Sequence, residues 1–184
     1  MGSVLLDMAV SLDGFIAGPN GELGGLHDWF FSPAGAEAVE ESVRNTGAIV
    51  IGRRTYDQGD AMDGFAHSPY AVEHFVLTHE APASAARGDM KFTFVTDGIE
   101  SAIEGAKTAA GGRNVAVGGG AGVARQCLEA GLVDEIQVHL VPVLLGGGIR
   151  LFDNGEAGKV GLEKIRVVDA PGVTHLVYRV VKED

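Results

Sequence analysis

Four short runs of almost uninterrupted apolar residues constrain the fold more than any other feature of this 184-residue sequence. The runs extend over residues 4–10, 48–51, 75–77 and 115–117. A strand with one side in water alternates apolar and polar residues, whereas a strand that is covered on both faces is apolar throughout. Covered strands are typical of parallel sheets, in which helices connect one strand to the next. The runs therefore predict an α/β fold with a mostly parallel central sheet and flanking helices.

Helix signals between these runs agree with that order. Ser32 followed by Pro33 has the pattern of an N-cap and a first helical residue. Apolar residues then recur at helical spacing, at Ala36, Val39 and Val43. The pattern predicts a helix in this segment.

Two further helices are expected nearer the middle of the chain. Asp97 and Glu100 resemble a capping box, and Gly111 lies where that helix should end. The next helix is expected over residues 121–130, with Cys127 on its buried side. We interpret Cys127 as a core residue rather than a nucleophile.

The last third of the chain changes character. Apolar residues alternate with polar ones from Ile136 to Leu140, and again over residues 174–181. A period of two is typical of strands. We expect antiparallel strands here, at the C-terminal edge of the sheet.

Charge and composition exclude several classes of function. The chain carries 14 Lys and Arg against 25 Asp and Glu, a formal net charge of -11. Such a field repels a phosphate backbone, so we expect no nucleic-acid partner. No stretch approaches the ~20 apolar residues of a membrane span, and the N-terminus lacks the basic segment of a signal peptide. We interpret residues 1–184 as a single cytoplasmic domain that does not bind a membrane.

Cysteine and histidine usage argues against a disulfide or a metal site. Cys127 is the single cysteine, which suits a reducing compartment. The six histidines lie scattered along the chain without the spacing of metal ligands. We therefore expect no metal.

A glycine-rich bend follows the apolar run at residues 115–117. Residues 118–122 read Gly-Gly-Gly-Ala-Gly and lead into the expected helix at 121–130. Free amides at a helix N-terminus, together with residues that lack side chains, form a cradle for phosphate. The same glycines suit a tight turn, and the segment matches neither the G-x-G-x-x-G nor the Walker A pattern. A phosphate cradle and a simple turn both stay open at this point.

A second candidate site follows the apolar run at residues 48–51. Arg53, Arg54 and Thr55 stand at the end of this strand and at the start of another helix. Guanidinium groups match the geometry of phosphate oxygens, and the threonine adds a hydroxyl. The alternative is a solvated pair of arginines that forms ion pairs with nearby carboxylates such as Asp57.

A long glycine-containing loop, residues 11–25, follows the first strand. Flexible loops of this length are often functional. The loop leads to Trp29 and Phe30, whose rings either stack on a flat ligand or belong to the core.

Taken together, these segments resemble the dihydrofolate reductase superfamily, and most of all the reductase domain of bacterial riboflavin biosynthesis with its stand-alone relatives. The matching motifs follow one another along nearly the whole chain, at residues 8–17, 52–56, 117–120, 132–136, 141–148 and 151–152. The family fold is a mostly parallel central sheet with an antiparallel edge and flanking helices. This dihydrofolate reductase-like fold agrees with the patterns above.

The resemblance implies that the chain binds NADPH. It places the bend at residues 118–123 under the pyrophosphate, the segment around Arg53 on the adenosine side, and the end of the third apolar run at the 2′-phosphate. The residues implied in this way are Ala9, Ile16 and Ala17 beside the nicotinamide; Gly52, Arg53, Arg54 and Thr55; Thr78 and His79; and Val117, Gly118, Gly119, Gly120, Ala121, Gly122 and Val123.

A reductase must also protonate the heteroatom that hydride transfer leaves negative. The resemblance implies catalytic roles for Asp13, which matches an aspartate near the substrate in the riboflavin-pathway reductases, and for Glu37, which lies roughly where dihydrofolate reductases carry a helix carboxylate. Asp13 also suits a turn before Gly14. The expected substrate contacts are Asp13, Trp29 and Phe30.

The expected function is an NADPH-dependent reductase of a planar heterocyclic or carbonyl-bearing small molecule, pterin-like or pyrimidine-like. A non-catalytic NADPH-binding or sensor protein of the same fold is the alternative. The resemblance also implies a homodimer.

Overall fold

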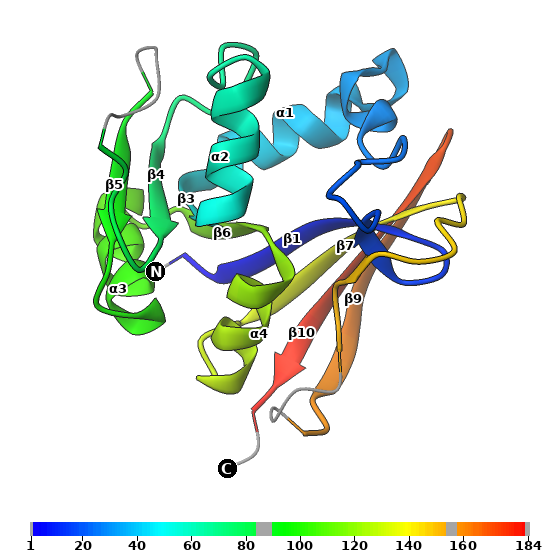
Figure 1. Ribbon diagram of the computed structural model, residues 1–184. Helices are drawn as coiled ribbons and strands as arrows, with labels where there is room; N and C mark the ends of the chain where they lie inside the picture. Colours follow the sequence, from blue (N-terminus) through cyan, green and yellow to red (C-terminus); the bar gives the residue numbers. More distant parts are fainter. Residues whose placement is uncertain (1, 84–89, 154–157, 183–184) are drawn as a thin grey trace.

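The core of the molecule is a single large sheet. The computed structural model describes residues 2–83, 90–153 and 158–182. The strands of the large sheet are β1 (Val4–Ser11), β3 (Thr46–Gly52), β4 (Glu73–Leu77), β5 (Phe92–Val95), β6 (Asn114–Gly119), β7 (Glu135–Val141), β9 (Gly161–Ala170) and β10 (Val173–Val181). Their order is β5-β4-β3-β6-β1-β7-β10-β9 (Figure 1). Neighbours from β5 to β7 pair in parallel, whereas β10 pairs antiparallel with both β7 and β9. The mostly parallel sheet with an antiparallel C-terminal edge is confirmed, although β7 still belongs to its parallel part.

Helices cover both faces of the parallel part of the sheet, with α1 and α2 above it and α3 and α4 below it in Figure 1. They are α1 (Ala36–Asn45), α2 (Arg53–Met62), α3 (Ile99–Ala110) and α4 (Ala121–Glu129), and the 3-10 turns η1 (Asp28–Phe31) and η2 (Pro33–Gly35) precede α1. The main core cluster joins α3 and α4 to strand residues such as Leu6 and Val50. On the other face, Tyr56 of α2 and Trp29 of η1 lie in separate clusters. None of the helices described is long and apolar enough to cross a membrane.

Alternation along β1 assigns its side chains to these two faces. Leu6 and Met8 belong to the main cluster, with α3 and α4. Ala9 belongs to the cluster that contains Trp29. Since successive strand residues point to opposite faces, Asp7 lies on the same face as Ala9. This second face is the one that matters for the candidate site.

Helix ends follow the sequence signals only in part. The Ser32 side chain accepts a hydrogen bond from the Gly35 amide at 3.2 Å, but this caps η2 rather than α1. The expected capping box at Asp97 is wrong, because α3 begins after Gly98 and has no side-chain cap. Gly98 has a φ of 111°, which turns the chain between Asp97 and the first helical amides. Gly111 does end α3, in the left-handed conformation.

The loop at residues 11–25 is more ordered than its glycine content indicates. Its middle forms β2 (Phe15–Ala17), which pairs antiparallel with β8 (Ile149–Arg150). The expectation of a long flexible loop is therefore wrong for this segment. The physical reason is that Phe15, Ile16 and Ala17 are all buried, so they anchor the loop to the core.

Cys127 lies in α4 and is fully buried in the main core cluster. Burial raises the pKa of its thiol to about 12. A thiol that stays protonated is a poor nucleophile, so the interpretation of Cys127 as a core residue is confirmed.

Candidate functional site

Two bends lie side by side at the carboxyl ends of the central strands. One joins β3 to α2 at Gly52, and the other joins β6 to α4 at Gly119 and Gly120. β3 and β6 are parallel neighbours, with Ile51 paired to Gly119. The bends are in close contact, because a Cβ built on Gly119 would stand 3.0 Å from the Thr55 hydroxyl. Ligands of open α/β sheets bind at this end of the strands.

Both bends lead directly into helices whose first amides have no side-chain cap. Gly52 occupies the N-cap position of α2, and Gly120 that of α4. Gly119 has a φ of 146°, and its peptide bond to Gly120 is cis. Uncapped amides and the positive end of the helix dipole attract anions. The paired N-termini are therefore suited to a pyrophosphate group.

The side chains next to these glycines differ in what they offer a ligand. Val117 and Val123 bury their side chains in the main core, so only their backbone is left to contact a ligand. Gly118 and Gly122 are exposed, and Ala121 is half-buried.

The Arg53 guanidinium lies at the outer side of the first bend. Its Nε donates to Asp57 Oδ1 at 2.7 Å, and its Nη1 donates to the Glu80 carbonyl oxygen at 2.8 Å. The Thr78 hydroxyl donates to the same carbonyl oxygen at 2.8 Å. The fold thus brings Arg53 and Thr78 together at the ends of two strands. Two further expected contacts are exposed at this edge, Arg54 and His79.

The residues expected beside a nicotinamide lie near the end of β1. Ala9, Ile16 and Ala17 are all buried. Ala9 packs in the cluster of Trp29, whereas Ile16 packs in the main core. A Cβ on Gly148 would collide with the Ala17 carbonyl oxygen, so the 146–148 loop runs tightly against β2.

The Asp13 carboxylate connects two loops. Its Oδ1 accepts hydrogen bonds from the Ser11 hydroxyl at 2.6 Å and from the Leu145 amide at 3.2 Å. Its Oδ2 accepts one from the Gly146 amide at 2.8 Å. The Ser11 hydrogen bond, with further help from the two amides, lowers the pKa of Asp13. In this conformation Asp13 is an acceptor that organises the loops, which is closer to the turn role than to that of a proton donor.

The other expected catalytic residue is Glu37 on α1, and the other expected substrate contacts are Trp29 and Phe30 in η1. Glu37 is exposed in the first turn of α1. The pKa of Arg166 on β9 is raised mainly by its hydrogen bond with Glu41 and to a lesser extent by the charge of Glu37. Trp29 is buried, and its ring meets that of Phe30 edge to face at 5.7 Å. Phe30 is half-buried and stacks on Tyr70 at 6.5 Å.

A buried polar cluster that sequence reasoning missed lies beside Ala9. His139 is the direct strand neighbour of Ala9, and His175 is the next one across the sheet. His139 Nε2 lies 2.7 Å from Asp7 Oδ1, and its Nδ1 lies 2.6 Å from His175 Nδ1. The Trp29 ring lies over both imidazoles, at 4.5 and 5.0 Å between centroids. The available signal was Asp7, which interrupts an apolar strand.

Burial and the neighbouring His139 lower the pKa of His175 to about 4, so its imidazole is neutral at neutral pH. Its Nε2 is buried and has no hydrogen-bond partner among the residues described. Burial likewise lowers the pKa of His27, which lies near His139. In the part of the chain that the structure describes, no group of His, Cys, Asp and Glu side chains is arranged to hold a metal.

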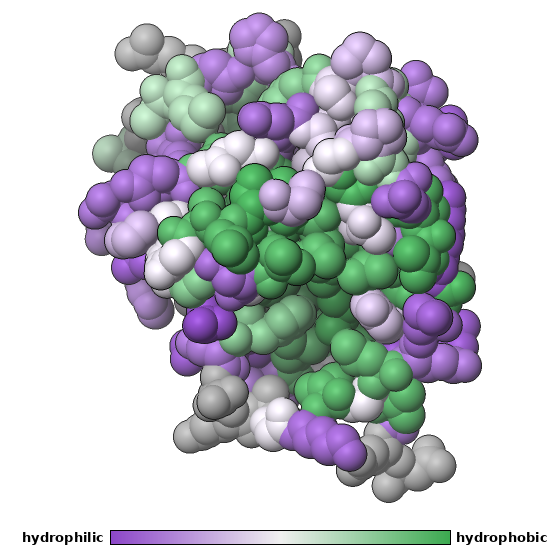
Figure 2. All heavy atoms as spheres, turned by 90° about the vertical axis from the view of Figure 1, so that its right-hand side faces the viewer, coloured by the Kyte–Doolittle hydropathy of each residue, from purple (hydrophilic) through white to green (hydrophobic). Residues whose placement is uncertain are grey.

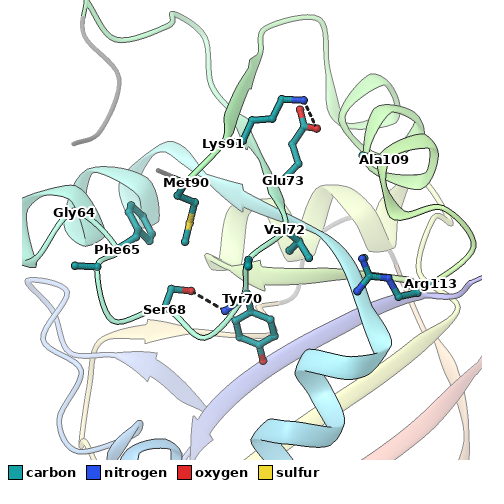
Figure 3. Close-up of a pocket in the computed structure, with 13 residues that line it drawn as sticks. Gly64, Phe65, Ser68, Tyr70, Val72, Glu73, Met90, Lys91, Ala109 and Arg113 are labelled. Carbon is teal, nitrogen blue, oxygen red and sulfur yellow. Dashed lines mark hydrogen bonds and ion pairs between the residues drawn. The ribbon is translucent and has the colours of Figure 1, made fainter. Parts of the chain in front are cut away.

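A cavity of about 770 Å³ lies elsewhere, at the amino ends of β3 and β4. Figure 3 shows Lys91 and Glu73 paired at one side of it, with Phe65, Tyr70 and Arg113 around it. None of the expected site residues lines it. We place the candidate site at the carboxyl ends of the strands, because the uncapped amides and the guanidinium converge there.

Comparisons with known sequences agree on one family. The family model of the RibD C-terminal domain matches residues 3–174. YwjB of Bacillus subtilis (strain 168) is 28% identical over 150 residues, which cover 80% of this chain and 81% of YwjB. The riboflavin biosynthesis protein RibD of Corynebacterium ammoniagenes is 32% identical over 165 residues, which cover 81% of this chain and 45% of that protein.

Solved structures share the fold over nearly the whole chain. A protein from Shewanella sp. PV-4 that is named for riboflavin biosynthesis has a TM-score of 0.77 at 26% identity, covering 98% of this chain and 99% of that one. Dihydrofolate reductase from Enterococcus faecalis, in a complex with NADP(H), has a TM-score of 0.63 at 18% identity and covers 98% of this chain and 97% of that one. The second likeness shows the fold alone.

Proposed function

The chain belongs to the RibD C-terminal domain family, and from this premise we propose that it is an NADPH-dependent reductase of a small planar molecule. The observation that carries the proposal is the pair of uncapped helix N-termini at Gly52 and Gly120, which lie side by side at the carboxyl ends of β3 and β6. The Enterococcus faecalis enzyme, which has the same fold, is a reductase complexed with NADP(H).

The residues present fit a phosphorylated dinucleotide. A side chain at Gly119 would press against Thr55, so the glycine keeps the bend open for close approach of a pyrophosphate. Arg53 and Arg54 place two guanidinium groups beside the bend in a chain of net charge -11. We assign Arg53, with Thr78, to the 2′-phosphate of the adenine ribose. Bound NADPH supplies a hydride from its nicotinamide ring.

The residues of the chain position the reacting rings and exclude water from them. Ala9 near the end of β1 and Ile16 and Ala17 in β2 have small or apolar side chains, which suits a flat ring and keeps water away. Phe30 is half-buried in η1, packs against the cluster that contains Ala9, and is available to contact a planar substrate. Asp13 holds the two loops that border this region. We propose a heterocycle or a carbonyl compound, pterin-like or pyrimidine-like, as the substrate.

A fluorescence titration with NADPH and NADH tests the proposal, followed by NADPH oxidation with a panel of pterins, pyrimidinones, quinones and small ketones. We expect saturable binding, tighter for NADPH, and oxidation by at least one heterocycle or ketone. Binding without oxidation by any member favours the sensor alternative. Absence of binding by either nucleotide contradicts the proposal.

We also propose that the chain forms a homodimer through the β9 side of the sheet. Figure 2 shows apolar side chains gathered over this side of the molecule. β9 is the last strand in the order of the sheet and exposes Leu162, Ile165 and Val167. A twofold axis would cover this patch with its own copy.

Sedimentation equilibrium tests the dimer. Val167→Lys should yield a monomer, because it places a charge in the middle of the patch. Met62→Lys is the matched control, since Met62 is also an exposed apolar residue but lies on α2. A wild-type chain that sediments as a monomer contradicts the proposed assembly.

A further inference from the structure

We infer that Asp7 is the acid that protonates the substrate, and that His139 and His175 position its carboxyl group. This inference rests on the proposed function, because it assigns the proton that a reductase of this kind must deliver. The acid then lies on strand β1, rather than on α1 as Glu37 does or on the loop after β1 as Asp13 does.

The sheet register brings Asp7 to the right place. Asp7 lies two residues before Ala9 on the same strand, so both side chains are on the face covered by η1. His139 pairs with Ala9 in the parallel ladder, and His175 pairs with His139 in the antiparallel one. The proposed ring site at Ala9 therefore has the Asp7 carboxyl group two residues away on β1 and the His139 imidazole beside it on β7.

The hydrogen bonds of Asp7 use only one of its oxygens. Oδ1 lies 2.7 Å from His139 Nε2 and 3.3 Å from Gln137 Nε2. Oδ2 has no hydrogen-bond partner among the residues described, and the side chain keeps 12% of its surface exposed. Since two nitrogen donors already occupy Oδ1, a proton carried by Asp7 belongs on Oδ2. That proton is then the one available to a substrate.

The two histidines fix this arrangement. His175 is neutral, so its Nδ1–H can donate to His139 Nδ1. His139 then carries its hydrogen on Nε2 and donates it to Asp7 Oδ1. Trp29 packs against both rings, tilted on His139 and edge to face with His175. His139 and His175 are therefore positioning residues, because they act through Asp7.

Groups from every neighbouring element face this cluster without neutralising Asp7. In the described ranges no lysine or arginine pairs with Asp7. The Tyr70 hydroxyl is hydrogen-bonded to the hydroxyl of Ser42 on α1 at 2.9 Å. Burial, and to a lesser extent the nearby Asp7, raises the pKa of Tyr70 to about 12. Arg166 and Glu41 pair with each other farther along the sheet.

A purely structural role does not need a carboxyl group here. Burying a carboxylate without a cation is costly, whereas an amide would accept the His139 hydrogen bond at a lower cost. The two alternative acids are less suitable: Asp13 has both oxygens occupied and a lowered pKa, and Glu37 is exposed on α1. Asp7 is the carboxyl group beside Ala9 that has an unoccupied oxygen.

The step itself is a proton transfer. When a hydride from a reduced nicotinamide adds to the carbon of a C=N or C=O bond, the π electron pair moves to the nitrogen or oxygen. That atom takes the proton from Asp7 Oδ2, and Asp7 is left as a carboxylate that the His139 Nε2–H stabilises. A proton from solvent then restores the acid through the exposed part of the side chain.

A cyclic imine, 3,4-dihydroisoquinoline, tests the assignment without any cofactor. Its absorbance distinguishes the neutral form from the protonated one, and the measurement is made at a pH where the free imine is neutral. Wild-type protein should hold the imine in its protonated form, paired with Asp7. Asp7→Asn should hold it in the neutral form, and His74→Gln, a buried histidine on β4, should behave as wild type. A neutral spectrum with wild-type protein overturns the inference.

NADPH oxidation then separates protonation from positioning. The N-methyl-3,4-dihydroisoquinolinium cation needs no proton, so it is the matched substrate. Asp7→Asn should slow reduction of the neutral imine at least about 100-fold, the range of general acid catalysis, and reduction of the cation by less than about threefold. Equal losses with both substrates overturn the acid role. If wild-type protein binds NADPH but reduces neither compound, the absorbance result decides the inference, and the panel of pterins, pyrimidinones, quinones and ketones decides the proposed function.

The positioning role of His139 has its own readout. His139→Leu removes the donor to Asp7 Oδ1, whereas His139→Gln keeps an N–H at that position. We expect the leucine variant to lose the protonated imine spectrum and the glutamine variant to restore most of it. Equal spectra for the two variants contradict the role of His139.

Discussion

Removing the carboxylate of Asp57 should improve NADPH binding. Asp57 Oδ1 accepts a hydrogen bond from Arg53 Nε at 2.7 Å, one turn along α2. In the proposed complex the 2′-phosphate needs the same guanidinium, so the carboxylate competes with it. Asp57→Asn keeps the shape of the side chain and removes the charge.

The size of the effect follows from the exposure of the pair. The side chains of Arg53 and Asp57 are 37% and 53% exposed, and exposed ion pairs contribute about 0.2–1 kcal/mol. Relief of this competition by about 0.5–1 kcal/mol corresponds to about two- to fivefold tighter binding of NADPH. NADH has no 2′-phosphate, so its affinity should stay the same. Arg53→Ala should act in the opposite direction and weaken NADPH binding about tenfold or more, because hydrogen bonds to a charged group contribute about 1.5–3 kcal/mol.

Calorimetric titration of both variants with NADPH and NADH at one fixed ionic strength measures these ratios, since exposed charges are screened by salt. A lower affinity of Asp57→Asn for NADPH would contradict the proposed competition. An equal change in the affinities for NADPH and NADH with either substitution would show that Arg53 does not contact the 2′-phosphate.

Three further predictions test other parts of the account. Gly119→Ala should weaken NADPH binding at least about tenfold, because the new Cβ meets Thr55 in a backbone conformation that costs about 1–3 kcal/mol for other residues. Gly112→Ala is the control, since Gly112 also has a positive φ but open space around it. Titration of both variants with NADPH should show unchanged binding for the control. Burial lowers the pKa of His175 to about 4, so the unfolded chain binds more protons below pH ~6.5. The stability that this group confers is present above pH ~6.5 and is lost toward pH 4. Urea unfolding should therefore show that His175→Gln loses less stability over that pH range than wild type. An equal loss would contradict the lowered pKa. Cys127, with a pKa raised to about 12, should react with a thiol reagent only as fast as the chain unfolds in urea, and rapid labelling of native protein would contradict its burial.

Much of the fold was predictable because it depends on burial, which leaves a local pattern. β1, β3, β4 and β6 lie where the apolar runs predict them, and their parallel order follows from the helices between them. The capping box at Asp97 was not correct, because a single glycine with positive φ changed the path of the chain before α3. β2 was also missed, since three buried residues decide the order of a loop that is otherwise rich in glycine.

The candidate site was predictable where the residues that contact the ligand are close together in the sequence. The glycines at 118–120 and the arginine at 53 are local motifs, and the parallel pairing of β3 with β6 brings them together. The Asp7–His139–His175 cluster is different, because its members lie on three strands that are distant in sequence. Only the register of those strands shows that they meet, and no short motif encodes that register.

Chemical-shift mapping of the backbone amides on addition of NADPH can show whether one dinucleotide occupies both bends. We expect the largest changes at the two bends together, residues 52–55 and 118–123, with smaller ones near Ala9. Changes confined to one bend, or concentrated at the cavity around Phe65, Glu73 and Arg113, would contradict a dinucleotide site at the carboxyl ends of β3 and β6.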